Sequence, residues 1–334
     1  TTPIKHIDDP DGEIALCILS AINLGLIKEK DELKDLCDLS VRALEEIIDY
    51  QEYPVEAAKK STLARRSLGI GYIGLAHFLA KNKVKYDDKE AWKLVDEITE
   101  AFQYYLLKAS NTLAKERGAC EYFDKTKYSD GILPIDSYKK DVDDLVNRKL
   151  SYNWNSLRKD IKESGLRHST LSAQMPSESS SVVSNATNGV EPPRDFLSIK
   201  KSKKGTLKQI VPDYNRLKNF YTLLWEMKSN EGYINTISVM QKYFDQAISG
   251  NWSYNPENYK DGEVPTSVMA NDLLTTYKLG WKTSYYQNTY DAKSDVDEPS
   301  HSVGWHDDVK DDTKPREEFK TDEEDEESCE ACAI

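Results

Sequence analysis

The sequence has few cysteines and no long apolar run, and both absences narrow the class of protein. Five cysteines in 334 residues are too few and too scattered for a disulfide framework, so we expect a reducing, cytoplasmic environment. No segment approaches the roughly 18 apolar residues of a transmembrane helix, and no signal-peptide core follows the N-terminus. The length suits one large α/β domain or two ordinary ones.

An excess of basic charge is also lacking, which argues against a surface for nucleic acid. The net charge of −13 is unevenly distributed, because residues 291–334 hold 17 acidic and 5 basic residues. The other 290 residues are nearly neutral. An acidic end of this kind is typical of a solvated, disordered segment. The sequence therefore predicts a folded body over residues 1–290 and a flexible acidic tail over residues 291–334.

Hydrophobic periodicity in the body predicts strands that alternate with helices. A nearly continuous apolar run suits a strand buried on both faces. The predicted strands are 13–19, 166–174 and 282–287. Repeats near 3.6 residues predict helices over 29–52, 89–117 (with Gly118 as C-cap), 213–228, 231–249 and 266–279. Strands separated by helices imply right-handed crossovers and a parallel sheet.

The segment from Gly69 to Gly74 matches Gly-x-Gly-x-x-Gly, the pattern of a dinucleotide-binding loop. Its context argues against that function. Residues 59–66 are too polar for a preceding core strand, and no clear acidic partner ends a second strand about 20 residues later. A helical pattern continues through Leu75, Phe78 and Leu79. We therefore expect these glycines to allow close helix packing.

A serine-rich segment, residues 176–181, follows the strand predicted at 166–174 and precedes a possible helix start near Val182. Consecutive hydroxyls and the free amides of a first helical turn can bind an anion. An ordinary serine-rich helix cap explains the same residues equally well. Composition alone leaves the two interpretations open.

Two adjacent tyrosines, Tyr285 and Tyr286, lie on the last predicted strand. Neighbouring residues of a strand point to opposite faces, so the two rings are not expected to stack. The ordinary interpretation is a pair of half-buried strand aromatics. A functional interpretation requires a reason for two redox-active phenols in succession.

The remaining candidates are cysteines. Cys329 and Cys332 form a Cys-x-x-Cys pair in the acidic tail, which can close a disulfide and reopen it by thiol exchange. The pair cannot complete a tetrahedral zinc site alone, although His301 and His306 lie in the same tail. A redox shuttle is the favoured interpretation. Cys17 lies in the apolar run, where a cysteine is usually a small core residue.

Together these motifs resemble the C-terminal part of the large (alpha) subunit of class I ribonucleotide reductase, of the aerobic bacterial and phage type. The resemblance runs from end to end and is carried by Gly12–Cys17 with Leu19–Ala21 and Asn23–Gly25, Leu68–Gly71, Ser169–Ala173 with Met175–Glu178, Ser184–Gly189 with Glu191–Arg194, and Lys282–Thr283 with Tyr285–Thr289. It implies an α/β fold, the second half of a ten-stranded α/β barrel. This half would be a five-stranded parallel half-barrel with helices.

The resemblance also implies the roles of individual residues. Cys17 would belong to a redox pair that reduces the ribose of a ribonucleoside diphosphate, and Tyr285 and Tyr286 would relay a radical. Cys329 and Cys332 would re-reduce the active-site disulfide and be reduced in turn by thioredoxin or glutaredoxin. The substrate diphosphate would be held by Pro176, Ser177, Glu178, Ser179 and Ser180. No metal site and no directly bound cofactor are expected on this chain.

The family's thiyl-radical cysteine, the redox partner of Cys17 and the effector sites would all lie upstream, and only 16 residues precede Cys17. We therefore expect a split subunit, whose partners are a separate N-terminal half of the large subunit and a diiron small (beta) subunit that supplies the radical. No nucleic acid or membrane partner is expected. The tail departs from many family members, which place four residues between its cysteines instead of two. The alternative is a non-catalytic fragment, an interaction or redox-tail module.

Overall fold

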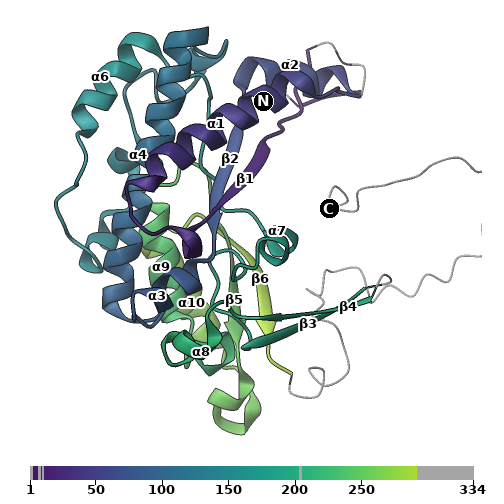
Figure 1. Cartoon of the computed structure of the whole chain (residues 1–334), viewed down its shortest axis with the longest axis vertical. Helices are drawn as coiled ribbons and strands as arrows, with labels where there is room; N and C mark the ends of the chain where they lie inside the picture. The colour runs from purple at the N-terminus through teal and green to yellow at the C-terminus, as the bar shows by residue number, and fades with distance from the viewer. Residues whose placement is uncertain (1–2, 7–8, 10, 203–204, 292–334) are drawn as a thin grey trace, which may run out of the picture. The chain divides into compact units, whose positions relative to one another are not determined.

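The computed structural model describes residues 3–6, 9, 11–202 and 205–291 (Figure 1). The helices are α1 (Glu32–Tyr50), α2 (Glu56–Arg65), α3 (Leu75–Lys81), α4 (Lys89–Arg117), α5 (Pro134–Ser137), α6 (Trp154–Ser164), α7 (Glu178–Val183), α8 (Tyr214–Leu217), α9 (Glu231–Gln241) and α10 (Thr266–Leu279). The strands are β1 (Ile18–Asn23), β2 (Leu68–Ile73), β3 (Leu197–Ser202), β4 (Gly205–Ile210), β5 (Ser249–Tyr254) and β6 (Thr283–Thr289).

Strand β2 has a neighbour on each side. It pairs in parallel with β1, from Ile18 opposite Leu68 to Asn23 opposite Ile73. On its other side the extended segment 170–173 runs parallel to it through a bridge between Ile70 and Ser172. The N–H of Ile70 donates to the carbonyl of Leu171 at 2.8 Å, and the N–H of Ala173 donates to that of Ile70 at 3.0 Å.

Asp245 connects this group to the second parallel pair, β5 and β6. The backbone N–H groups of Leu171 and Ser172 donate to its carboxylate at 2.8 and 3.0 Å, and the N–H of Gln246 donates to the carbonyl of Ser172 at 3.3 Å. The carboxylate of the half-buried Asp245 thus takes the place of a ladder carbonyl for two backbone N–H groups. The parallel pairing confirms the predicted α/β class.

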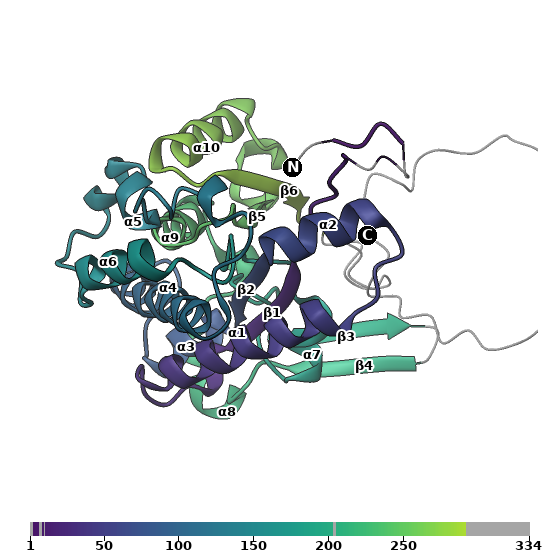
Figure 2. The same cartoon turned by 90° about the horizontal axis from the view of Figure 1, so that it is seen from above.

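Helices α3, α4 and α9 cover one side of these strands (Figure 1). Leu68, Ile70 and Tyr72 alternate along β2 and are fully buried, and the Tyr72 ring packs edge-on against Phe102 of α4 at 5.3 Å between centroids. In both views α3, α4 and α9 lie on one side of β1, β2, β5 and β6, whereas β3 and β4 extend from the other (Figures 1 and 2). All six residues of β2 are buried, and Leu68, Ile70 and Tyr72 share the face that points towards the helices.

Several predicted elements are confirmed, namely the helices over 29–52, 89–117 and 266–279 as α1, α4 and α10, and the strand over 282–287 as β6. Gly118 ends α4 with a positive φ of 85°, as a glycine C-cap requires. The helical pattern through Leu75, Phe78 and Leu79 forms α3. These elements have strong local periodicity or a clear stop signal.

Other predictions are wrong. The strand predicted over 13–19 begins only at Ile18, and Leu16 and Leu19 are 43% and 51% exposed. Only Ile22 of β1 is buried, so the strand is not buried on both faces. The segment 166–174 pairs with β2 as a short extended stretch with one bridge.

The predicted helices over 213–228 and 231–249 are also too long. The first contains only the four-residue α8 and short 3-10 turns. Side chains take two of the carbonyls that helical hydrogen bonds would use. The Tyr221 hydroxyl donates to the carbonyl of Pro212 at 2.8 Å, and Lys85 Nζ donates to the carbonyl of Tyr221 at 2.8 Å. The second ends at Gln241, and β5 follows with alternating burial. The antiparallel pair β3–β4 and helices α2 and α6 were not predicted.

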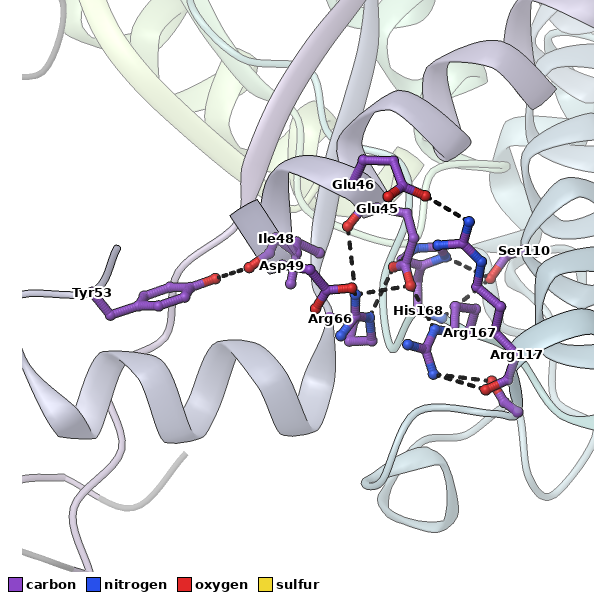
Figure 3. Close-up of polar contacts among 11 residues, drawn as sticks. Glu45, Glu46, Ile48, Asp49, Tyr53, Arg66, Ser110, Arg117, Arg167 and His168 are labelled. Atoms are coloured by element: carbon purple, nitrogen blue, oxygen red, sulfur yellow. Dashed lines mark hydrogen bonds and ion pairs between the residues drawn. The ribbon is translucent and has the colours of Figure 1, made fainter. Parts of the chain in front are cut away.

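A buried ion cluster joins α1 to the starts of β2 and of segment 166–174 (Figure 3). The fully buried Glu45 accepts from Arg66 Nε at 2.8 Å, Arg167 Nε at 2.6 Å and His168 Nε2 at 3.0 Å. Ser110 Oγ lies 2.9 Å from His168 Nδ1, which suits a neutral ring that donates from Nε2. Burial lowers the pKa of His168 despite the nearby carboxylate. The cluster therefore fixes three separate chain segments.

Candidate active site

The tyrosine pair on β6 forms a close ring contact that sequence reasoning did not predict. The ring centroids of Tyr285 and Tyr286 are 4.2 Å apart, with an angle of 53° between their planes. Their hydroxyl oxygens are 3.5 Å apart, at the outer limit of a hydrogen bond. The Tyr285 hydroxyl also raises the pKa of Tyr286. The two phenols are thus neighbours on one side of the strand.

A β-bulge explains this arrangement. Gly250 lies opposite Ser284, but Trp252 lies opposite Gln287, so β6 contains one residue more than β5 over this stretch. Both tyrosines therefore lie opposite Asn251. Because a bulge interrupts the alternation of side chains, two adjacent residues can point the same way. The expectation that the rings lie on opposite faces is wrong for this reason.

Cys17 lies one residue before β1, and its side chain is exposed. A Cβ atom placed on Gly69 would lie 3.5 Å from Cys17 Sγ and 3.3 Å from Ala173 Cβ. The thiol thus lies on the β2 face opposite the helices, beside the segment that precedes the serine-rich loop. Neighbouring protein atoms nevertheless displace part of the water around the thiol, and this desolvation raises its pKa. The interpretation of Cys17 as a core residue is wrong, because its side chain is exposed.

The other two described cysteines differ from Cys17. Cys37 and Cys120 are both buried, and burial raises the pKa of each thiol, to about 11 for Cys120. A buried thiol of high pKa supplies little thiolate and is inert. Among the cysteines that the structure describes, only Cys17 is accessible for thiol exchange.

The glycine motif forms neither a dinucleotide loop nor a helix contact. Gly69 and Gly71 lie inside β2, and α3 begins only after Gly74. A Cβ atom on Gly71 would lie 2.4 Å from the carbonyl oxygen of Ala173, so the glycine permits close approach of the neighbouring segment. The predicted close packing is present, but it is between strands and not between helices.

The serine-rich loop begins a helix earlier than predicted, because α7 starts at Glu178. Ser177 is the N-cap residue, and Pro176, Ser179 and Ser180 are exposed. The hydroxyls of Ser177 and Ser181 are buried and have no hydrogen-bond partner among the residues that the structure describes. The Ser177 Oγ lies 3.2 Å from a Cβ placed on Gly189. The Ser177 side chain therefore does not cap α7 by a hydrogen bond, unlike an ordinary serine N-cap.

Sequence reasoning missed three polar residues near these positions. The side-chain amide of Gln174 takes the place of a neighbouring strand's backbone beside Tyr72. It accepts from the N–H of Tyr72 at 3.2 Å and donates to the Tyr72 carbonyl at 2.9 Å. Glu191 accepts from Asn251 Nδ2 at 2.6 Å, and burial raises the pKa of Glu191. For Gln174 and Asn251, a polar residue within strand-like sequence was the available signal, whereas Glu191 lies in a turn-rich stretch that gave none. Their contacts link the loop after segment 170–173 to β5.

The tail cysteines Cys329 and Cys332 lie outside the described residues, as do His301 and His306, so their predicted roles stay predictions. In the part of the chain that the structure describes, no group of three or more His, Cys, Asp and Glu side chains is placed to hold a metal ion. No helix within the described ranges is long and apolar enough to cross a membrane.

Comparison with known proteins adds an independent finding. The family model described as "Ribonucleotide reductase, barrel domain" matches residues 4–219 and 213–287. The chain is 60% identical over 298 residues to the ribonucleoside-diphosphate reductase subunit alpha of Haemophilus influenzae, which covers 89% of this chain and 39% of that protein. It is 55% identical over 249 residues to the ribonucleoside-diphosphate reductase 1 subunit alpha of Escherichia coli, which covers 75% of this chain and 33% of that protein.

A phage relative is also similar. The subunit alpha of Enterobacteria phage T4 is 42% identical over 299 residues, which covers 88% of this chain and 39% of that protein. The chain thus spans about two fifths or less of the length of these curated relatives.

Proposed function

Because this chain belongs to the ribonucleotide reductase barrel family, we propose that it acts as the C-terminal part of a class I large subunit that reduces ribonucleoside diphosphates. The observation that carries the proposal is the contact between Tyr285 and Tyr286, whose hydroxyls are 3.5 Å apart. Two phenols this close can exchange a hydrogen atom without a further reagent. The accessible Cys17 on the sheet face then supplies one of the two thiols that the reduction consumes.

The tyrosine pair has the chemistry of a radical relay. A phenoxyl radical on one ring takes a hydrogen atom from the other hydroxyl, so the O–H bond breaks on one ring and forms on its neighbour. Charge and atoms balance, because proton and electron move together. The first radical would come from a separate small subunit. Tyr285 is 47% exposed, which leaves it accessible for such a transfer.

Cys17 would act in the reduction itself. Two thiols give up two hydrogen atoms and become a disulfide. One hydrogen atom leaves with the 2′-hydroxyl as water, and the other takes the place of that hydroxyl on the ribose carbon. The second thiol would come from the N-terminal part of the large subunit. The exposed Leu16 and Leu19 beside Cys17 give β1 an apolar surface that this part would cover.

The serine-rich loop would hold the substrate diphosphate. The unpaired buried hydroxyls of Ser177 and Ser181 support this role, because hydroxyl groups and the free amides of a helical first turn donate to phosphate oxygens. Pro176, Glu178, Ser179 and Ser180 complete the proposed loop. In the acidic tail, Cys329 and Cys332 would return electrons from thioredoxin or glutaredoxin to the active-site disulfide.

Reconstitution tests the proposed function. This chain, mixed with a diiron small subunit alone, is expected to form no deoxynucleotide from CDP, because the thiyl-radical cysteine is upstream in the family. Addition of the N-terminal half of the large subunit is expected to restore dCDP formation. Activity without that half, or none in the complete mixture, would contradict the proposal. The second outcome would favour a non-catalytic fragment.

The cysteines are distinguished by the reductant that supports turnover. Cys17→Ser in the reconstituted enzyme is expected to reduce multiple turnover about 100-fold or more with both dithiothreitol and thioredoxin. Replacement of both Cys329 and Cys332 with Ser should abolish only turnover that depends on thioredoxin or glutaredoxin, because a small dithiol can still diffuse to the site. Equal loss with both reductants in the tail variant would assign the tail a structural role.

A further inference from the structure

Asn251 of β5 lies opposite the bulge that brings the two tyrosines together. It faces both Tyr285 and Tyr286, because the register advances two residues on β5 and three on β6 between Gly250 and Trp252. In an uninterrupted parallel ladder, the N–H of Tyr286 would donate to a backbone carbonyl. Here it donates to the side-chain Oδ1 of Asn251 at 3.1 Å.

The remaining polar groups of Asn251 are also bound. Its Nδ2 donates to Glu191 Oε1 at 2.6 Å, so the amide oxygen must face β6. Its backbone N–H donates to the Tyr233 hydroxyl at 3.3 Å instead of to a ladder carbonyl. The Asn251 side chain thus takes the place of a backbone carbonyl on the edge of β5 that faces β6. The backbone N–H of Asn251 bonds to the Tyr233 hydroxyl.

The groups that hold Asn251 are themselves fixed. Tyr233 is buried in α9 and stacks on Tyr86, with the centroids 6.4 Å apart and an angle of 12° between the ring planes. The Tyr86 hydroxyl donates to the carbonyl of Val190 at 2.6 Å, next to Glu191. A Cβ atom on Gly250 would lie 3.0 Å from the Tyr233 hydroxyl, so the glycine leaves room for that hydroxyl beside the strand.

We propose that Asn251 is a positioning residue, which holds the bulge of β6 through Glu191 and Tyr233 and thereby keeps the Tyr285 and Tyr286 rings on one side of the strand. Without its amide, the N–H of Tyr286 loses its acceptor. Regular pairing with β5 then becomes the better arrangement, and regular pairing sends adjacent side chains to opposite faces. The effect on turnover rests on the proposed function, whereas the effect on the ring contact does not.

Four variants of the full chain test this role. Asn251→Ala removes both side-chain hydrogen bonds. Asn251→Asp keeps an acceptor for Tyr286 but places a carboxylate against Glu191. Combining Asn251→Asp with Glu191→Gln exchanges the amide and the carboxylate between the two positions. The glutamine amide at position 191 then donates to the aspartate at position 251, which still accepts from the N–H of Tyr286. Asn258→Ala is the matched control, because its amide donates to the carbonyl of Met227 at 3.1 Å and does not contact β6.

The direct measurement is the nuclear Overhauser contact between the two rings in ring-labelled protein, assigned with Tyr285→Phe and Tyr286→Phe. We expect this contact in the wild type, in the double variant and in Asn258→Ala, and its loss in both single Asn251 variants. In the reconstituted enzyme, kcat should fall at least about tenfold in the single variants, with KM for CDP unchanged, and recover in the double variant.

A ring contact that persists in Asn251→Ala would overturn the positioning role. Failure of the double variant to restore the ring contact would overturn the part assigned to Glu191. If Asn251→Ala does not fold, the comparison of Asn251→Asp with the double variant takes its place as the test. Absence of reductase activity in every reconstituted sample, including the wild type, would count against the proposed function and leave the ring measurement decisive for Asn251.

Discussion

Replacement of Tyr286 or Tyr285 with Phe is expected to abolish nucleotide reduction by the reconstituted enzyme. Each change keeps the ring and removes the hydroxyl that exchanges a hydrogen atom with its neighbour 3.5 Å away. A phenylalanine ring has no O–H bond to break, so the radical cannot pass. We expect kcat to fall by about three orders of magnitude, which corresponds to about 4 kcal/mol in the barrier.

The measurement is dCDP formation together with the affinity for the small subunit, which should change little. Tyr290→Phe is the matched control. Tyr290 follows the same strand, and its ring packs against Trp225 with 5.3 Å between centroids, away from the pair. Wild-type rates in Tyr285→Phe or Tyr286→Phe would remove that tyrosine from the relay. A large loss in Tyr290→Phe would show that any hydroxyl in this segment matters.

The second large effect is on stability. Glu45→Ala is expected to lower the free energy of unfolding by about 3–5 kcal/mol, the typical cost of removing one partner from a buried ion pair. The change leaves Arg66 and Arg167 without their shared carboxylate, and Arg66 is almost fully buried. Urea unfolding followed by circular dichroism measures the loss.

Glu46→Ala provides a control on the same helix. Glu46 pairs with Arg117 at 2.6 Å, but both side chains are largely exposed, at 62% and 41% (Figure 3). Surface pairs of this kind contribute less than about 1 kcal/mol. Similar losses in Glu45→Ala and Glu46→Ala would contradict the role given to the buried cluster.

Acid should weaken the same cluster. Burial alone would raise the pKa of Glu45, but hydrogen bonds from His168, Arg66 and Arg167 outweigh burial and lower it to about 2. A lowered folded-state pKa means that the stabilisation is present above the ordinary pKa of 4.5 and is lost as the pH falls towards 2. The difference in unfolding free energy between wild type and Glu45→Ala should therefore shrink below about pH 4.5.

Local sequence patterns determined the parts of this protein that depend on near neighbours along the chain. The 3.6-residue repeat predicted α1, α4 and α10, since an amphipathic helix needs only one continuous apolar face. Gly118 marked the end of α4 because a positive φ suits glycine. The ordered motifs from Gly12 to Thr289 indicated the reductase family, which the family model confirms.

Only the tertiary structure decided the geometry of the candidate site. Cys17 was expected in a core strand, but its exposure depends on which segments lie beside β1. The tyrosine rings were expected on opposite faces, but the register of β6 against β5 places an extra residue opposite Asn251. Glu45 meets His168 across 123 residues of sequence. Such contacts form between segments whose local patterns carry no information about each other, so the pairing of strands and of buried charges is settled only when the whole chain packs.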